Sequence, residues 1–208
     1  MRTMTMRLKS AFALSLSALL IACLGVSPKA RFYTLNTVNA PQITTGNAIQ
    51  YDNVHTSVRI QIMPITIDET VDRPQIVITN SQNQVQILEQ QRWAQPLKYE
   101  IGRVVGEHLN QRIPNSIVSA YPHQLSDSGL QVNIQVIAFE SSMTTPAKIK
   151  VNYTLLNTKS KQTVSHTKVY SQPLVSGKQA NSVSDIIEAQ SQNILQLSQD
   201  IVIACNTM

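Results

Sequence analysis

The stretch LQVNIQVIAF, residues 130–139, sets the architecture of this 208-residue chain. Its apolar side chains alternate with Gln and Asn, which is the period of a β-strand with one buried face. Downstream, residues 148–155 and 162–170 predict a hairpin around the polar turn NTKSK. Upstream, QIVIT and VQIL predict another around NSQNQ. Shorter strands are expected at 31–38, 58–62 and 116–121, and 39–56 has the composition of a loop.

Two segments have helical spacing instead. The first begins near Leu97, has apolar residues at every third or fourth position, and stops at Asn115. The second begins after the capping box Ser182–Asp185. Its narrow apolar seam is Val183, Ile187, Gln190, Ile194, Leu197, Ile201 and Ala204. We expect this seam to lie on the sheet, although an oligomer seam of three heptads is the alternative.

These elements predict an α+β fold, with a mixed, mostly antiparallel β-sheet and the two main helices packed on one face. We expect residues 31–208 to form a single compact domain, because a chain of this length is large enough for one hydrophobic core.

The chain begins with the pattern of a bacterial secretory signal. Three basic residues precede an apolar run over residues 11–22. The run ends in Leu20-Ile21-Ala22-Cys23, which matches a lipobox and predicts cleavage before Cys23 and diacylation of its sulfur. The alternatives are an ordinary signal peptide or a cysteine buried in a core helix. A membrane-spanning anchor is disfavoured, because the run is about 12 residues and a span needs about 20.

The lipobox divides the chain into a signal peptide (1–22), a lipidated N-terminus with a short tether (23–30) and the domain (31–208). The tether reaches about 25 Å when it is extended. Leu24 follows the cysteine at the position where an Asp would retain the protein at the inner membrane. We therefore expect the protein to be anchored at the periplasmic face of the outer membrane.

Cleavage before Cys23 would also lower the net charge of the protein. The full chain carries 17 basic and 12 acidic residues, a net +5, but three of the basic residues lie in 1–22, which leaves 14 − 12 = +2. Nucleic acid is therefore not an expected partner. Six lysines and no acidic residue lie in 141–184, which predicts either an edge protected from aggregation or a basic surface for lipid headgroups or an acidic partner.

Catalytic motifs are sparse. The chain has no GxSxG, HExxH, CxxC or glycine-rich phosphate loop. Its four histidines have no ligand spacing and are expected at the surface or at caps. Asp68, Glu69 and Asp72 are expected in a solvated turn rather than a metal site. Cys205 has no partner once Cys23 is acylated; it closes a helix, or else joins another chain or a metal. No catalytic residue, metal or cofactor is predicted apart from the covalent lipid on Cys23, with palmitate among its acyl chains.

Two segments stand out as candidate partner-binding sites. The first is Asp72-Arg73-Pro74-Gln75, where an Asp–Arg pair at a strand start either braces the loop or meets a partner. The second centres on Arg92 and Trp93, the only tryptophan. A tryptophan at a strand-to-helix junction is either a core plug or an interface anchor.

Four blocks occur in order after the lipobox: SPKARFYTL, VDRPQIV, RWAQPL and EIGRVVGEHLNQRI. Together they resemble the PqiC (YmbA) family of ABC-type transport auxiliary lipoproteins of Gram-negative bacteria. The resemblance covers most of the chain after Cys23. Gln95 is a departure, because the family usually has Glu there.

The resemblance implies a non-enzymatic subunit of an MCE-type lipid transport system that maintains the cell envelope. It implies a lipoprotein in the inner leaflet of the outer membrane and a homo-oligomeric ring. The implied partners are a periplasm-spanning MCE-domain protein (PqiB-like) and an integral inner-membrane subunit (PqiA-like). A lipid-anchored periplasmic hydrolase and a monomeric lipid carrier are the alternatives.

Overall fold

The computed structural model describes residues 28–37, 58–80, 82, 84–174 and 182–208. The predicted signal peptide, Cys23 and the loop 39–56 lie outside these residues.

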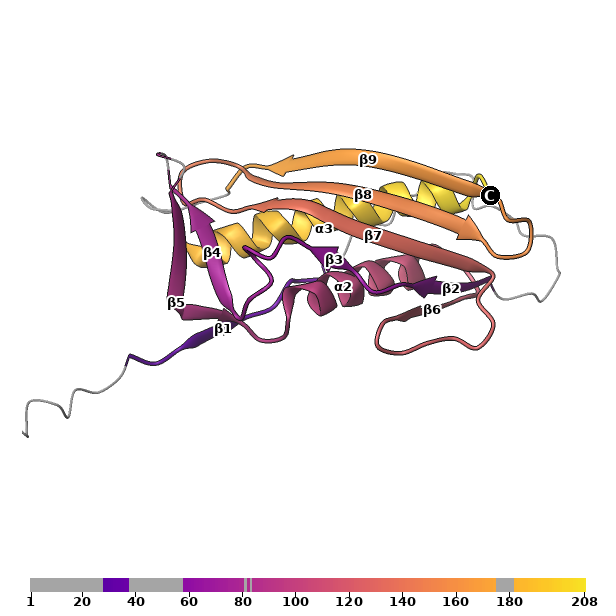
Figure 1. The fold of residues 1–208 in the computed structure, drawn as a ribbon, viewed down its shortest axis with the longest axis horizontal. Coiled ribbons are helices and arrows are strands. Elements are labelled where there is room, and N and C mark those ends of the chain that lie inside the picture. Colours follow the sequence, from indigo (N-terminus) through magenta and orange to yellow (C-terminus); the bar gives the residue numbers. More distant parts are fainter. Residues whose placement is uncertain (1–27, 38–57, 81, 83, 175–181) are drawn as a thin grey trace, which may run out of the picture.

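Six strands form the larger sheet, in the order β6-β2-β7-β8-β9 with the short β3 also beside β7 (Figure 1). Strands β2, β3 and β6 run parallel to their partners, whereas β7, β8 and β9 form an antiparallel meander. The bounds are β2 (Val58–Ile62), β3 (Thr66–Ile67), β6 (Ser116–Ala120), β7 (Leu130–Glu140), β8 (Ala147–Asn157) and β9 (Thr163–Gln172).

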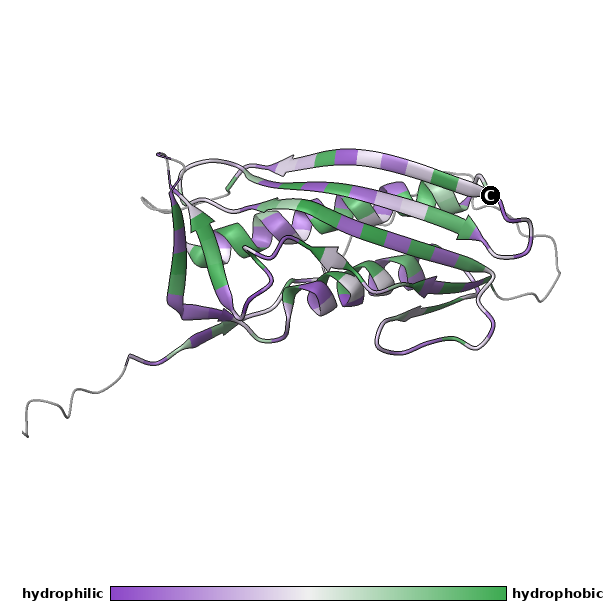
Figure 2. Ribbon diagram, in the orientation of Figure 1, coloured by the Kyte–Doolittle hydropathy of each residue, from purple (hydrophilic) through white to green (hydrophobic). Residues whose placement is uncertain are grey.

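The alternation of Leu130, Val132, Ile134 and Val136 with polar residues is confirmed, and the register shifts between Val136 and Ala138. Val132 lies opposite Leu155 and Ile134 opposite Tyr153, and all four side chains are buried. The neighbouring residues are polar and mostly solvent-facing, so Figure 2 shows hydrophobic and hydrophilic bands in alternation along β7 and β8.

The buried face of this sheet is covered by α2 (Leu97–Arg112) and α3 (Val183–Cys205) (Figure 1). All seven seam residues of α3 are buried, and the helix packs against β8, β9 and α2. The seam therefore packs into the core of the same domain, as expected, and is not an oligomer seam. The capping box is confirmed, because the Ser182 amide donates to Asp185 Oδ2 and the Asp185 amide donates to Ser182 Oγ.

A second sheet of three strands closes one end of the domain. Its order is β1 (Arg31–Tyr33), β5 (Val85–Trp93) and β4 (Gln75–Thr79), with β1 parallel to β5 and β4 antiparallel to it. The chain enters the domain at this end, and its C-terminus lies at the opposite end (Figure 1). A single α+β domain is confirmed; the division of the strands between two sheets was not predicted.

The predicted strand 31–38 ends early, at Tyr33. Beyond it the main chain leaves the sheet, because the Leu35 amide donates to Glu100 Oε2 at 3.1 Å and the Asn36 amide donates to Ser191 Oγ at 3.0 Å. The Leu35 side chain is 1% exposed.

Candidate partner-binding groove

The two segments singled out in the sequence meet in one groove of about 490 Å³, lined by Asp72, Arg73, Pro74, Trp93, Ala94, Gln95, Pro96, Lys98 and Tyr99. It lies where β4 starts, β5 ends and α2 begins, close to β1 (Figure 1). Main-chain hydrogen bonds fix this junction. The Trp93 amide donates to the Pro74 carbonyl at 2.8 Å, and the Ala94 amide donates to the Tyr33 carbonyl at 2.8 Å.

Asp72 braces its loop through α2 rather than through Arg73. Its Oδ2 lies 3.0 Å from Nζ of Lys98, and both side chains are about one-third exposed. The hydrogen bond and charge of Asp72 raise the pKa of Lys98. An ion pair this exposed contributes little stability, but it sets the position of the loop.

Arg73 is left without an anionic partner among the described residues. Its Nε is buried and has no hydrogen-bond partner there, and its guanidinium forms none of the ion pairs in that part of the chain. The groove thus holds two cationic side chains, Arg73 and Lys98, against the single carboxylate of Asp72. An acidic group on a binding partner would neutralise the excess positive charge of the groove.

Trp93 forms the floor of the groove rather than a projection from it. Its side chain is 6% exposed, and its ring meets Phe139 edge to face, with centroids 6.2 Å apart and an interplanar angle of 79°. This geometry favours the core-plug interpretation. The groove wall is built from the residues around Trp93.

Gln75 and Arg92 do not line the groove. They lie opposite each other on β4 and β5, and both are held by Glu89. Gln75 Nε2 donates to Glu89 Oε2 at 3.2 Å, and Arg92 Nε donates to the Glu89 main-chain carbonyl at 3.2 Å. The structure therefore brings four of the six candidate residues into the groove and places the other two on the adjacent strands.

A polar clamp beside the groove was not predicted. Glu100 is buried, and its Oε2 accepts hydrogen bonds from the Leu35 amide at 3.1 Å and from Arg103 Nη2 at 2.9 Å. The same Arg103 nitrogen donates to the Leu35 carbonyl at 2.8 Å. The segment after β1 is thereby fixed to α2.

The acidic residues Asp68, Glu69 and Asp72 are exposed. Asp68 Oδ1 accepts the Thr70 amide at 2.8 Å. Hydrogen bonding from the Thr70 side chain, and then from this amide, lowers the pKa of Asp68. Within the described residues, no three His, Cys, Asp or Glu side chains gather as metal ligands. The loop is a solvated turn, as its composition indicated.

One histidine was misplaced by the sequence analysis. His108 was expected at the surface or at a cap, but it is 1% exposed, between α2 and α3, with Nδ1 3.2 Å from Ser198 Oγ. A hydrolase would need such a serine–histidine pair to be accessible. Here Ser198 is equally buried, and its hydroxyl donates to the Ile194 carbonyl at 2.8 Å, so the pair joins two helices.

The lysines of 141–184 do not form one surface. Lys148 and Lys150 are exposed on β8, Lys159 and Lys161 lie in the β8–β9 turn, and Lys168 points toward Asp200 at 3.9 Å. The remaining one, Lys178, lies outside the described residues. The described lysines are thus spread over β8, β9 and the turn between them.

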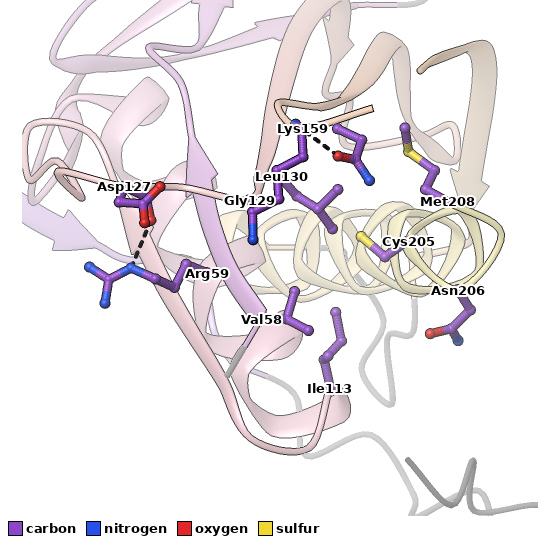
Figure 3. Close-up of a pocket in the computed structure, with 11 residues that line it drawn as sticks. Val58, Arg59, Ile113, Asp127, Gly129, Leu130, Lys159, Cys205, Asn206 and Met208 are labelled. Carbon is purple, nitrogen blue, oxygen red and sulfur yellow. Dashed lines mark hydrogen bonds between the residues drawn. The ribbon is translucent and has the colours of Figure 1, made fainter. Parts of the chain in front are cut away.

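A second cavity of about 420 Å³ opens at the end of the domain opposite the groove. Figure 3 shows its apolar side chains, Val58, Ile113, Leu130, Cys205 and Met208. Burial raises the pKa of the Cys205 thiol to about 12. Cys205 therefore serves as an apolar residue in the last turn of α3.

A family model described as an ABC-type transport auxiliary lipoprotein component matches residues 33–202. The chain belongs to this family. The resemblance to PqiC (YmbA) proteins is thereby confirmed, and the auxiliary lipoprotein role is that of the family. Within the described residues, no helix is long and apolar enough to cross a membrane.

Solved structures share the fold. A crystal structure of an uncharacterized protein has a TM-score of 0.65 and 16% identity, covering 86% of this chain and 99% of that one. A Xanthomonas campestris protein of the DUF330 family has a TM-score of 0.61 and 18% identity, covering 83% of this chain and 92% of that one. Comparison with curated protein sequences gives no match.

Proposed function

We propose that this auxiliary lipoprotein is the non-enzymatic outer-membrane subunit of an MCE-type intermembrane lipid transport system. Its acylated Cys23 holds the domain at the periplasmic face. There a ring of copies receives a periplasmic MCE-domain protein (PqiB-like), which is linked to an integral inner-membrane subunit (PqiA-like). The observation that carries the proposal is a lipobox cysteine placed just ahead of an auxiliary lipoprotein domain that starts at residue 33.

The anchor is tested with Cys23→Ala. We expect the wild-type protein to sediment with outer-membrane fractions and to carry acyl chains, palmitate among them, in its N-terminal peptide. The variant should be soluble in the periplasm with an unchanged circular dichroism spectrum, and cells that carry it should show the envelope defect of a deletion. A soluble variant that restores the envelope fully would contradict the proposal.

The groove is the candidate contact for the MCE partner. It supports this role because Arg73 there has no anionic partner among the described residues and because proline and aromatic side chains form its wall. Lys98 adds positive charge at the edge, and Trp93 gives the floor its rigidity.

Affinity purification from solubilised envelopes tests this contact. Arg73→Gln should reduce the recovered MCE partner, whereas Lys159→Gln, which removes one positive charge from the exposed β8–β9 turn, should not. Circular dichroism checks that both variants are folded. Equal recovery with both variants would exclude the groove as the contact but leave the complex itself in place; absence of the MCE protein from the wild-type sample would overturn the larger proposal.

A monomeric lipid carrier is the second candidate, and the apolar cavity at the opposite end favours it. Its volume lies within the range of small-molecule sites. Native mass spectrometry of protein purified in gentle detergent should then find lipid bound to monomers, and Leu130→Trp should displace it. Lipid-free monomers would exclude this candidate.

A further inference from the structure

We propose that the outer face of β1, formed by Phe32 together with the neighbouring Arg92 of β5, rests on the lipid surface and sets the orientation of the domain on the membrane. The inference depends on the proposed acylation of Cys23.

Phe32 is the most exposed large apolar side chain among the described residues, at 65%. Successive side chains of a strand point to opposite faces. Tyr33 packs against the core and donates from its hydroxyl to Gln91 Oε1 at 2.6 Å, so Phe32 points the other way. Its partner in the β1–β5 register is Arg92, which places an aromatic and a cationic side chain side by side on that outer face.

The tether brings this face to the membrane. Phe32 follows Cys23 by only nine positions (32 − 23), which is about 30 Å even when fully extended. The clamp of Glu100 and Arg103 on Leu35 then prevents β1 from peeling away. The end of the domain that carries Phe32 therefore stays beside the bilayer whenever the anchor is inserted (Figure 1).

The charges around Phe32 suit anionic headgroups. Arg92 lies on the same face as Phe32 and is partly exposed. Lys29 and Arg31 are exposed nearby in the sequence, with Arg31 on the other face of β1. In the described part of the chain, none of the three forms an ion pair with a carboxylate. Basic residues near a membrane are attracted to anionic lipids, and an aromatic ring suits the headgroup level. A lipid surface accounts for both the charge and the exposed ring at one place.

The test places a fluorescent reporter at two equally exposed positions at different ends of the domain. Protein purified from the cell envelope with its native N-terminus is inserted into vesicles of phosphatidylethanolamine and phosphatidylglycerol that contain lipids brominated near the headgroup. Phe32→Trp is compared with Ile203→Trp, because Ile203 on α3 is 63% exposed. Both variants keep the buried Trp93 as a common background.

We expect bromolipid to quench the emission of Phe32→Trp strongly and to leave Ile203→Trp at the wild-type level. Replacing phosphatidylglycerol with phosphatidylcholine, or raising the salt, should weaken the quenching, because salt screens the attraction. Equal quenching at both positions, or none at either, would overturn the inference. A blue-shifted but unquenched emission at residue 32 would also overturn it and would indicate that a protein covers this face.

Vesicle flotation separates this inference from the anchor. If the protein fails to float, the acylation of Cys23 is wrong. If it floats and residue 32 is not quenched, only the orientation is wrong.

Discussion

Replacing Trp93 with alanine distinguishes a core plug from an interface anchor. The indole is almost fully enclosed and packs edge to face on Phe139. The main-chain hydrogen bond from the Trp93 amide to the Pro74 carbonyl is available to any residue at this position. The substitution therefore removes side-chain packing and leaves the backbone of the junction in place.

The expected loss can be set against the stability of a whole domain. Truncating a buried tryptophan to alanine costs about 3–5 kcal/mol, and domains of this kind have about 5–15 kcal/mol in total. The edge-to-face pair adds about 0.5–1.5 kcal/mol beyond burial. In a double-mutant cycle with Phe139→Ala, this coupling should make the combined loss smaller than the sum of the single losses.

Urea unfolding followed by far-ultraviolet circular dichroism measures these losses, because Trp93 is the only tryptophan and its fluorescence disappears with it. Partner recovery is measured in parallel below the unfolding transition. The reasoning is refuted if Trp93→Ala costs less than about 0.5 kcal/mol, the usual range of surface changes, and shows no coupling to Phe139. Loss of partner binding at undiminished stability would instead make Trp93 an interface anchor.

Three further perturbations test other parts of the domain. Glu100→Ala leaves the Leu35 amide without its acceptor and should lower the unfolding free energy in urea by about 1–3 kcal/mol; no loss would show that the clamp is not needed. Burial, and then a hydrogen bond to Asp200, raise the pKa of Tyr170, so its folded-state pKa lies above the unfolded value of about 10. The stability from this neutral phenol is present below about pH 10 and is lost at higher pH, so wild-type urea midpoints should fall more steeply there than those of Tyr170→Phe; parallel curves would contradict the assignment. Because burial raises the pKa of Cys205 to about 12, its thiol should react slowly with a disulfide reagent at about pH 8 and rapidly in urea, and fast native labelling would show an exposed thiolate.

The sequence predicted best where a single local pattern decides the structure. The alternation in 130–139 identifies the buried face of β7 without knowledge of its neighbours, and the seam of α3 identifies the face that packs. The capping box Ser182–Asp185 is similarly local, because donor and acceptor lie three residues apart. These features require only the period of the element and the chemistry of its ends.

Contacts between distant segments were not predictable in this way. The clamp joins Leu35 to Glu100, 65 positions apart, and nothing near either residue indicates the other. Glu100 lies within a helix where a glutamate normally faces water, and its burial is favourable because both the Leu35 amide and the Arg103 guanidinium donate to it. The same limit applies to the groove: both segments were singled out, but their meeting depends on how β5 turns into α2.

The positions of the two cavities separate the two candidate functions. The groove lies beside β1, at the end that the proposed anchor on Cys23 would hold near the membrane, whereas the apolar cavity is lined by Cys205, Asn206 and Met208 near the C-terminus, at the other end of the domain in Figure 1. A partner that delivers lipid to the membrane must approach the end that carries the groove. A carrier would instead open its cavity away from the anchor, and its lipid would have to cross the length of the domain. Arg73→Gln and Leu130→Trp therefore act at opposite ends, and the variant that restores envelope integrity less well identifies the end that the transport system uses.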